Sequence, residues 1–280
     1  MKGVDISKYQ AKLTIAQIKE AGYDFAILRG GYSTNGIIRK KMIDKSFEKF
    51  YSQAKEIGFP VGCYWYSTAK AMAEGKAEAQ FFYKNCLQGK QFEMPIYIDV
   101  EDGNWQSHDK KGVTDAIIAF CDYLEDRGYY AGVYASLSWF NSKIDVSRLK
   151  DYTKWVAKWV MNANSKPTVP FSAFDLWQYS DNGRIAGYTV DVDQAYINFP
   201  EIIKKAKKNG CFTVESTSKP QETAPQSQSE QSNVVKLHVV KAGETLSYIA
   251  KKYNTSVDVL VKKNGIQDKN KIYVGQRLKI

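Results

Sequence analysis

Short apolar runs alternate with amphipathic segments along the first 200 residues of this 280-residue chain. The apolar runs are rich in β-branched and aromatic residues and predict strands at 4–6, 25–30, 61–66, 96–100, 131–135, 154–160 and 175–178. Helical periodicity predicts helices at 14–21, 44–57, 69–87 and 113–127. This alternation indicates an α/β fold with a parallel sheet, and so many units in one domain favour a (β/α) barrel over an open sheet.

The strand predicted at 96–100 leads into two carboxylates, Asp99 and Glu101. Because side chains alternate along a strand, we expect both carboxylates on one face, with Cα atoms ~6.6 Å apart. Paired, partly desolvated carboxylates push each other's pKa values apart, so that one stays ionised while the other holds a proton. Such a pair is typical of a glycosidase, although acidic residues at a strand end are also commonly caps or surface charges.

Polar and aromatic residues also follow the other predicted strands. They are Asp5, Tyr32, Trp65, Tyr66, Tyr134, Ser136, Trp177, Gln178, Tyr179 and Asp191. In a barrel of parallel strands, the chemistry is placed at the carboxyl ends of the strands. We therefore expect these residues to gather at one rim, near Asp99 and Glu101.

Composition narrows the classes of chemistry. Hydrophobic residues make up 44% and aromatic residues 14% of the chain, which is enough for a sizeable core. Four cysteines lack the close spacing of a metal site and predict no disulfide framework. The chain has only two histidines, His108 and His238, which disfavours a multi-histidine zinc site and most peptidase and amidase mechanisms. We expect neither a metal ion nor an organic cofactor.

Composition changes sharply after Phe212. Residues 213–235 are rich in Ser, Thr, Gln and Glu and predict a flexible linker between a domain at 1–212 and a module at 236–280. The formal net charge of +10 is uneven, with +5 on the first domain and +7 on the module. A basic chain favours polyanions such as nucleic acid, anionic lipid or a bacterial wall. Because no apolar run suits a signal peptide or a membrane span, we expect synthesis in the cytoplasm and no membrane insertion.

Six motifs follow one another along the first domain. They are Gly3-Val4-Asp5-Ile6-Ser7, Gly62-Cys63-Tyr64-Trp65-Tyr66, Ile98-Asp99-Val100-Glu101, Gly132-Val133-Tyr134, Leu176-Trp177-Gln178-Tyr179 and Val190-Asp191-Val192-Asp193. With these motifs, residues 1–200 resemble the glycoside hydrolase family 25 lysozymes of bacteriophage endolysins and bacterial autolysins. The resemblance implies a modified, flattened barrel that cleaves the β-1,4 bond from N-acetylmuramic acid to N-acetylglucosamine in peptidoglycan. Trp65 departs from the family, which often has His there.

The resemblance and the chemistry of the residues together suggest catalytic roles. Glu101 is expected to be the general acid, with its pKa raised by Asp99 and other anions. Asp99 is expected to stay ionised, and either to attack the anomeric carbon or to orient the acetamido group of the sugar. Of the last two aspartates, we match Asp191 rather than Asp193 to the family's residue. Asp5 and Asp191 are expected to support the developing positive charge, or only to make structural hydrogen bonds.

Four further residues are expected to bind the substrate. Aromatic faces pack against the C–H faces of sugar rings, which suggests Tyr64, Tyr134 and Trp177, with Gln178 beside them. Tyr64 and Tyr134 are equally well explained as core aromatics.

The module at 236–280 resembles a LysM domain over nearly its whole length. The resemblance rests on the run from Leu237 to Ala250 and on the closing segment from Val274 to Ile280. It implies a small α+β domain in the order strand, helix, helix, strand, with two loops that form a shallow groove for N-acetylglucosamine units. The glycan-binding residues expected from the resemblance are Gly243, Glu244, Thr245, Leu246, Asn264 and Ile266.

These observations predict a modular peptidoglycan hydrolase, an N-acetylmuramidase that its LysM domain holds on the bacterial wall. We expect a phage endolysin made in the host cytoplasm, with a bacterial autolysin of the same chemistry as the alternative. A wall-binding protein that no longer catalyses is a second alternative, and the presence of Asp99 and Glu101 argues against it. A nucleic-acid binder, suggested by charge alone, would need a basic helix or an aromatic–basic strand motif, which the sequence lacks.

Overall fold

The computed structural model describes residues 1–103, 109–159, 174–211, 237–240, 245–246, 249–250, 253, 255–264, 266 and 277–280. The chain divides into two compact units, residues 1–217 and 218–280. The linker expected at 213–235 lies outside the described residues, so the domain boundaries stay a prediction. Among the described residues, no helix has the length and apolar character needed to cross a bilayer.

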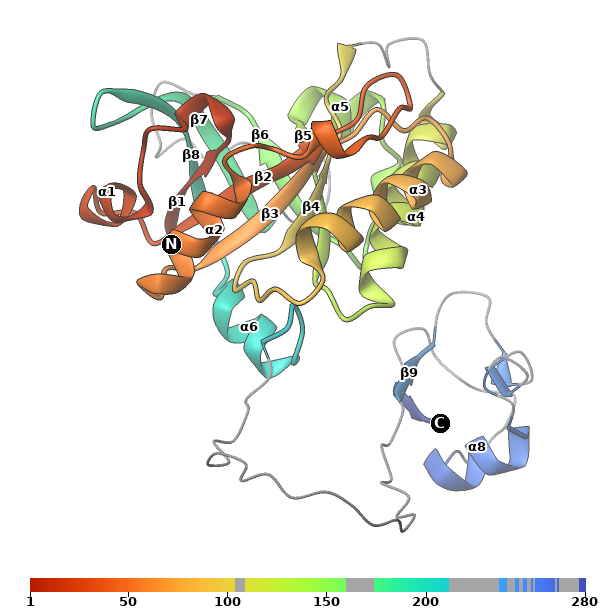
Figure 1. The fold of residues 1–280 in the computed structure, drawn as a ribbon. Helices are drawn as coiled ribbons and strands as arrows, with labels where there is room; N and C mark the ends of the chain where they lie inside the picture. Colours follow the sequence, from red (N-terminus) through yellow and green to blue (C-terminus); the bar gives the residue numbers. More distant parts are fainter. Residues whose placement is uncertain are drawn as a thin grey trace, which may run out of the picture. The chain divides into compact units, whose positions relative to one another are not determined.

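Eight strands close into a barrel in the first unit (Figure 1). They are β1 (Lys2–Ile6), β2 (Phe25–Tyr32), β3 (Val61–Tyr66), β4 (Ile96–Asp99), β5 (Ala131–Ser136), β6 (Thr153–Ala157), β7 (Leu176–Ile185) and β8 (Tyr188–Ala195). Strands β1 to β7 pair in parallel, each with the next along the chain. The barrel predicted from the sequence is therefore confirmed.

The last strand corrects the expectation of a wholly parallel sheet. Strand β8 runs antiparallel to both β7 and β1 and closes the barrel between them. A two-residue turn joins β7 to β8, and both of its residues, Ala186 and Gly187, have positive φ angles of 47° and 85°. Positive φ at both positions matches the twist of a tight hairpin, so the chain reverses here instead of crossing over through a helix.

Helices surround the barrel. They are α1 (Ile15–Glu20), α2 (Phe47–Glu56), α3 (Met72–Phe82), α4 (Lys110–Glu125), α5 (Leu137–Ser142) and α6 (Phe199–Lys205), with short turns η1 (Lys8–Gln10), η2 (Lys40–Met42), η3 (Tyr83–Leu87) and η5 (Val146–Arg148). Helices α3 and α4 lie side by side (Figure 1). Their close approach needs a glycine, because a Cβ atom on Gly75 would lie 2.2 Å from the carbonyl oxygen of Ala116.

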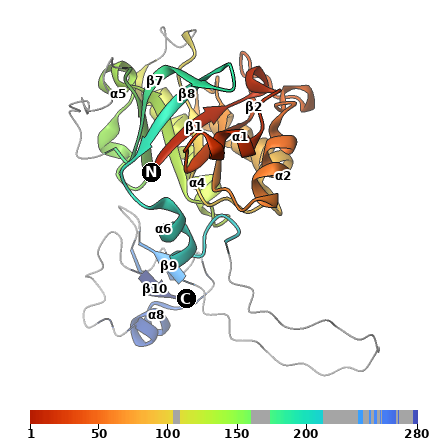
Figure 2. The same ribbon diagram turned by 90° about the vertical axis from the view of Figure 1, so that its left-hand side faces the viewer.

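Alternate residues of each strand face the barrel interior and the helix layer. On β2, Phe25 and Ile27 belong to the interior cluster, whereas Ala26 and Leu28 belong to the cluster beneath the helices. Helix α6 follows β8 and lies below the barrel (Figure 2), where it contributes Phe199 to the interior cluster. This alternation decides which side chains reach the rim at the end of the barrel away from α6.

The second unit has its own small core. Among its described residues are β9 (Leu237–Val239), α8 (Val257–Asn264) and β10 (Arg277–Lys279), and β9 pairs antiparallel with β10. Six buried residues form the core: Val240, Leu246, Ile249, Ala250, Leu260 and Leu278. Two paired strands with helical segments between them agree with the α+β order predicted for this module.

Candidate active site

All four carboxylates singled out in the sequence line one small pocket at the rim of the barrel. The pocket is lined by Asp5, Tyr64, Asp99, Glu101, Tyr134, Trp155, Gln178 and Asp191. Asp5 lies on β1, Asp99 ends β4, and Glu101 follows two residues later. The structure therefore brings together the predicted carboxylates, both predicted tyrosines and Gln178.

Asp191 reaches the rim by a different route from the other carboxylates. Because β8 is antiparallel, its beginning lies at this rim, and Asp191 pairs directly opposite Asp5. Asp193 faces the same side of β8 and is wholly buried, and its carboxylate accepts a hydrogen bond from the indole of Trp155 at 2.8 Å. A fifth carboxylate thus lies next to the predicted four.

Gln178 ties three parts of the rim together. Its Nε2 donates to Asp5 Oδ2 at 2.7 Å, and its Oε1 accepts from the Tyr134 hydroxyl at 2.9 Å and from the Trp159 indole at 3.0 Å. The side chain is buried, so its bonds to Asp5 and Tyr134 form away from water, whereas the bond from Trp159 is partly buried. Gln178 lies in the site as expected, and its geometry suits positioning of its neighbours.

Burial raises the pKa of both carboxyls of the predicted catalytic pair. Asp99 is only 3% exposed, and burial followed by the charge of Glu101 raises its pKa well above the usual value, while Arg29 opposes the shift. Partial desolvation also raises the pKa of Glu101; the Tyr134 hydroxyl opposes this shift and the charge of Asp191 adds to it. The raised pKa suits Glu101 as a proton donor. At Asp99 the shift runs opposite to the expectation of a carboxyl that stays ionised.

The other two carboxyls are perturbed in the same direction. Burial, then the charges of Asp191 and Asp193, raise the pKa of Asp5 well above its usual value, while the hydrogen bond from Gln178 lowers it. Burial, then the charge of Asp181, raise the pKa of Asp191 to about 6. All four carboxyls at the rim therefore have a higher pKa than the same groups in water.

Trp177 does not reach the site, and the prediction that it binds sugar is wrong. Its side chain is wholly buried, packs against Tyr179 with ring centroids 5.4 Å apart, and donates to the carbonyl oxygen of Lys158 at 2.9 Å. The physical reason is the strand period, since Trp177 is one residue out of phase with the interior-facing Gln178. Trp65 likewise faces the helix layer, where its indole donates to Glu78 at 3.1 Å.

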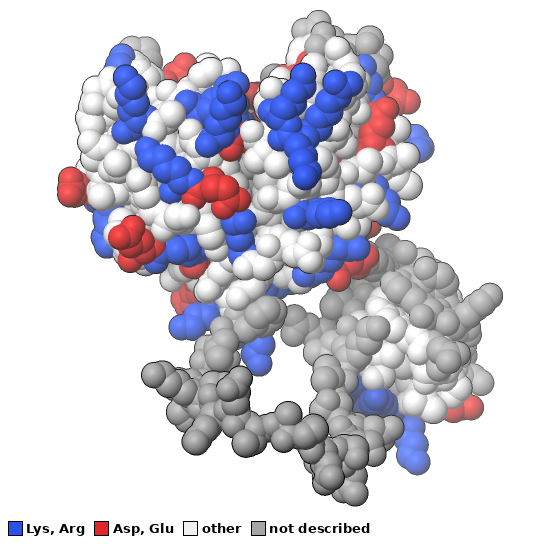
Figure 3. Space-filling model, in the orientation of Figure 1, with Lys and Arg blue, Asp and Glu red and all other residues white. Residues whose placement is uncertain are grey.

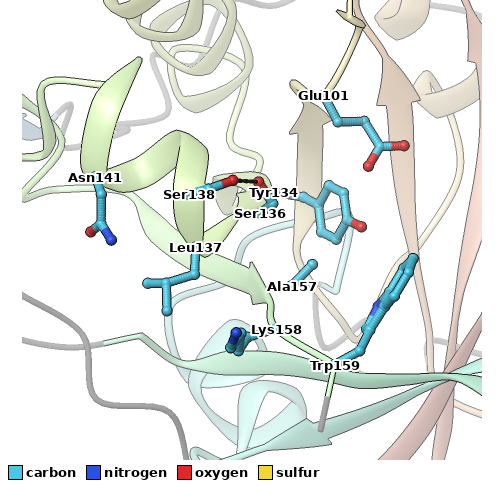
Figure 4. Close-up of a pocket in the computed structure, with 9 residues that line it drawn as sticks. All are labelled: Glu101, Tyr134, Ser136, Leu137, Ser138, Asn141, Ala157, Lys158 and Trp159. Carbon is cyan, nitrogen blue, oxygen red and sulfur yellow. Dashed lines mark hydrogen bonds between the residues drawn. The ribbon is translucent and has the colours of Figure 1, made fainter.

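Trp159 is the aromatic residue that sequence analysis missed. Beside Glu101 lies a pocket of about 530 Å³ (Figure 4), lined by Glu101, Tyr134, Ser136, Leu137, Ser138, Asn141, Ala157, Lys158 and Trp159. The Trp159 side chain is 55% exposed, while its indole N–H is held by Gln178. An anchored, exposed ring is suited to packing against a sugar. The sequence placed Trp159 inside a strand at 154–160, but β6 ends at Ala157.

Tyr64 and Tyr134 form the floor of the site. The ring centroid of Trp155 lies 6.1 Å from that of Tyr64 and 4.5 Å from that of Tyr134. Tyr134 is buried apart from a small fraction, and Tyr64 is half-buried. Both rings thus combine the two roles that the sequence left open, since they pack in the core and also line the pocket.

Comparison with known proteins settles the family. Residues 4–188 match the sequence model of glycosyl hydrolases family 25. The chain belongs to glycosyl hydrolase family 25. Residues 238–280 match the LysM domain, so the second unit of this family 25 protein carries that module.

Relatives and solved structures agree with this membership. The autolytic lysozyme of Clostridium acetobutylicum is 29% identical over 193 residues, which cover 69% of this chain and 54% of that protein, so the chain spans about half of its length. The endolysin of Bacillus phage B103 is 57% identical over 44 residues, or 15% of this chain and 17% of that protein. The crystal structure of the bacterial lysozyme from Streptomyces coelicolor superposes with a TM-score of 0.63 and 24% identity, covering 76% of this chain and 98% of that one.

The predicted glycan-binding residues of the LysM domain have different surroundings. Leu246 is buried in the small core, and the Asn264 amide donates to the carbonyl oxygens of Leu260 at 2.9 Å and Lys279 at 2.8 Å. The Leu246 side chain therefore serves the core of this unit, and its place in a glycan-binding loop stays a prediction. Asn264 holds α8 against β10. Thr245 is exposed and Ile266 half-buried, whereas Gly243 and Glu244 lie outside the described residues.

Proposed function

We propose that this family 25 protein is an N-acetylmuramidase, which cleaves the β-1,4 bond between N-acetylmuramic acid and N-acetylglucosamine in peptidoglycan. The observation that carries the proposal is the meeting of Asp99 and Glu101 with Asp5 and Asp191 in one rim pocket. Two carboxyls of different environment are what hydrolysis of a glycosidic bond requires. The LysM domain supports the same substrate, because it adds a second glycan-binding module to the chain.

Glu101 is proposed to protonate the glycosidic oxygen. Its raised pKa favours the protonated form, and it lines pockets on both sides, of about 530 and 490 Å³. A glycan that runs from one pocket to the other would pass its linkage over this carboxyl. After the proton has moved to the leaving oxygen, the Glu101 carboxylate can take a proton from the water that completes hydrolysis.

Asp99 is proposed to act on the anomeric carbon, either by attacking it or by orienting the acetamido group that does so. Burial disfavours ionised Asp99 in the free protein, but positive charge that develops on the sugar lowers the pKa of a nearby carboxyl. Ionised Asp99 is then favoured where the reaction needs it. Asp5 and Asp191 are proposed to add to this stabilisation, and Gln178 fixes Asp5 for it.

Substituting Glu101 tests the proposal. Glu101→Gln keeps the shape of the side chain but removes the acidic proton, so we expect clearing of a wall suspension to slow by about 100-fold or more. Sedimentation of the variant with walls should be unchanged. Glu56→Gln, the same chemical change at an exposed position of α2, should clear walls at the rate of the unaltered protein. Normal clearing by Glu101→Gln would refute the assignment of the acid. Absence of clearing by the unaltered protein would favour a wall-binding protein that does not catalyse.

Two biological settings fit this chemistry, and we propose a phage endolysin over a bacterial autolysin. The likeness of 44 residues to a phage endolysin supports the first setting, and the longer likeness to an autolytic lysozyme supports the second. The neighbouring genes distinguish them. A holin-like gene beside this one would support the endolysin, and a bacterial operon for wall turnover would overturn it.

A further inference from the structure

Glu101 also lines a second pocket, which Trp159 does not line. This pocket has a volume of about 490 Å³ and is lined by Lys8, Tyr9, Arg29, Tyr32, Tyr64, Tyr66, Asp99 and Glu101. Two of these residues are cationic and four are tyrosines. A polar, aromatic pocket with positive charge beside a cluster of carboxylates is suited to a ligand that is part sugar and part anion.

Asp44 holds the two cationic residues of this pocket in place, since it binds the Arg29 side chain and the Lys8 backbone. The Asp44 side chain is wholly buried, and its Oδ2 accepts from Arg29 Nε at 2.7 Å and from the backbone N–H of Lys8 at 3.0 Å. The ion pair offsets the charge of Arg29. Arg29 acts here as a positioning residue for Tyr9, whose ring centroid lies 5.2 Å from the guanidinium carbon. A capping box between Ser7 and Gln10 also fixes η1, the short turn that carries Lys8.

Lys8 supplies the charge that remains. Its Nζ lies 5.3 Å from the ring centroid of Tyr9 and 5.7 Å from that of Tyr32. Such cation–π contacts hold an ammonium group without neutralising it. Within the part of the chain that the structure describes, Lys8 makes no ion pair. Tyr9 itself is 74% exposed, which leaves an aromatic surface at the mouth of the pocket.

We propose that Lys8, Tyr9 and Tyr32 form a subsite for a carboxylate carried by the glycan strand. The proposal rests on the muramidase function proposed above. Muramic acid differs from glucosamine by a lactyl ether, whose carboxyl group is either free or linked to a peptide that bears carboxylates of its own. In the described part of the chain, the rim pocket that holds Asp5, Asp99 and Asp191 has no cationic side chain to attract such a group, and Asp191, with a pKa of about 6, would repel it at neutral pH.

The consequence is a preferred orientation of the strand. A carboxylate next to Lys8 is attracted, whereas the same group over the carboxylates is not, and this difference selects one alignment of the sugars across Glu101. Lys158 lines the pocket on the Trp159 side, but no aromatic ring or acidic side chain among the described residues holds its ammonium group. We therefore assign the anionic substituent to the Lys8 side.

Four substrates and one variant test this subsite. The substrates are glycan strands with peptide stems, strands stripped to free lactyl carboxylates, and both kinds with their carboxylates capped as neutral amides. Lys8→Met keeps an unbranched side chain one atom shorter and removes its charge. We expect the kcat/KM of the variant to fall by about 10-fold on an uncapped strand, mainly through KM, and by less than about 2-fold on capped strands.

Salt and a second lysine provide the controls. Added salt should weaken the action of the unaltered protein on uncapped strands and have less effect on Lys8→Met. Lys158→Met should not distinguish capped from uncapped strands. A loss confined to stem-bearing strands would identify a stem carboxylate, and a loss on stripped strands would identify the lactyl carboxylate; both support the subsite.

Two results would overturn the subsite: an equal effect of Lys8→Met on capped and uncapped strands, or the selective loss in Lys158→Met instead. If the unaltered protein released no reducing ends from any strand, the muramidase function would fail. Binding of the same four strands to the unaltered 280-residue chain and to its Lys8→Met variant would then still decide the subsite. Both proteins contain the LysM domain, so a difference in affinity would come from Lys8. Equal affinities of the two proteins for uncapped strands would contradict the subsite.

Discussion

The carboxylates at the rim act on one another, and this effect adds to that of burial on the proton affinity of the proposed acid. Glu101 owes its raised pKa first to desolvation, and Asp191 adds to the shift through its negative charge. Asp181 in turn raises the pKa of Asp191. The proposed acid therefore depends on residues that never touch the scissile bond.

A substitution of Asp191 should shift the pH dependence of the reaction. Protonated Glu101 is the active form, so kcat/KM is lost as pH rises through its pKa. Asp191→Asn removes a charge that raises this pKa, and the alkaline limb of the profile should therefore move to lower pH, by roughly 0.5 to 1 unit. Asp181→Asn is the matched control, and its effect on this limb should be smaller. An alkaline limb that does not move in Asp191→Asn would contradict the electrostatic account.

Single side chains also mark the limit of prediction from the sequence. Asp5, Asp99, Glu101 and Gln178 could be found because polar groups at strand ends stand out against apolar runs. Asp191 was matched through the family motif, and the structure places it inside antiparallel β8 rather than after a strand. Trp177 was misplaced and Trp159 missed for one reason: the side-chain direction in a strand changes with every residue. An error of one residue in phase placed Trp177 in the pocket, whereas its side chain lies in the core. An error of three residues in the end of a strand, at 160 instead of Ala157, placed the exposed Trp159 inside that strand.

At the scale of elements, the parallel part of the barrel could be predicted, and its closure could not. The alternation of apolar runs with amphipathic helical segments predicts β1 to β6. The β7–β8 hairpin contains polar, exposed residues such as Asp181 and Asn182, and this composition is typical of a loop. Closure depends on β8 pairing with β1, nearly the whole domain away in sequence. Local patterns carry no information about such a partner.

The contact between α3 and α4 gives an element-scale prediction. Gly75→Ala should favour an isolated helix by about 1 kcal/mol. Here, the new methyl group would overlap the Ala116 backbone, so we expect the free energy of unfolding to fall by about 1 to 3 kcal/mol.

Denaturant unfolding measures this effect. Ala77→Val, which adds bulk at an exposed position of the same helix, should change the free energy of unfolding by less than about 1 kcal/mol. A variant Gly75→Ala that is as stable as the unaltered protein would show that the two helices do not need this close contact.

At the scale of the whole molecule, each unit has its own core, and positive charge is widespread. Lysine and arginine side chains are spread over the visible face of the barrel unit (Figure 3), while the proposed catalytic carboxylates gather at the rim. The sequence predicted a division because composition changes abruptly after Phe212, and the structure has two compact units, residues 1–217 and 218–280. If both units bind the wall as proposed, the LysM unit raises the effective concentration of the barrel unit at its substrate.

Removal of residues 218–280 tests that relation. We expect cleavage of short soluble glycan fragments to be unchanged, and clearing of insoluble walls at low protein concentration to fall by about 10-fold to 100-fold. A thermal melt by circular dichroism checks that the shortened chain is folded. Equal clearing of walls by the long and the shortened chains would show that the LysM domain adds nothing to the reaction.

The reducing ends released from a digested wall test the central claim most directly. After digestion, borohydride reduction labels each new end, and mass spectrometry identifies the labelled sugar. The account predicts reduced muramic acid at the new ends in digests by the unaltered protein and almost none in digests by Glu101→Gln. Reduced N-acetylglucosamine at those ends would contradict it.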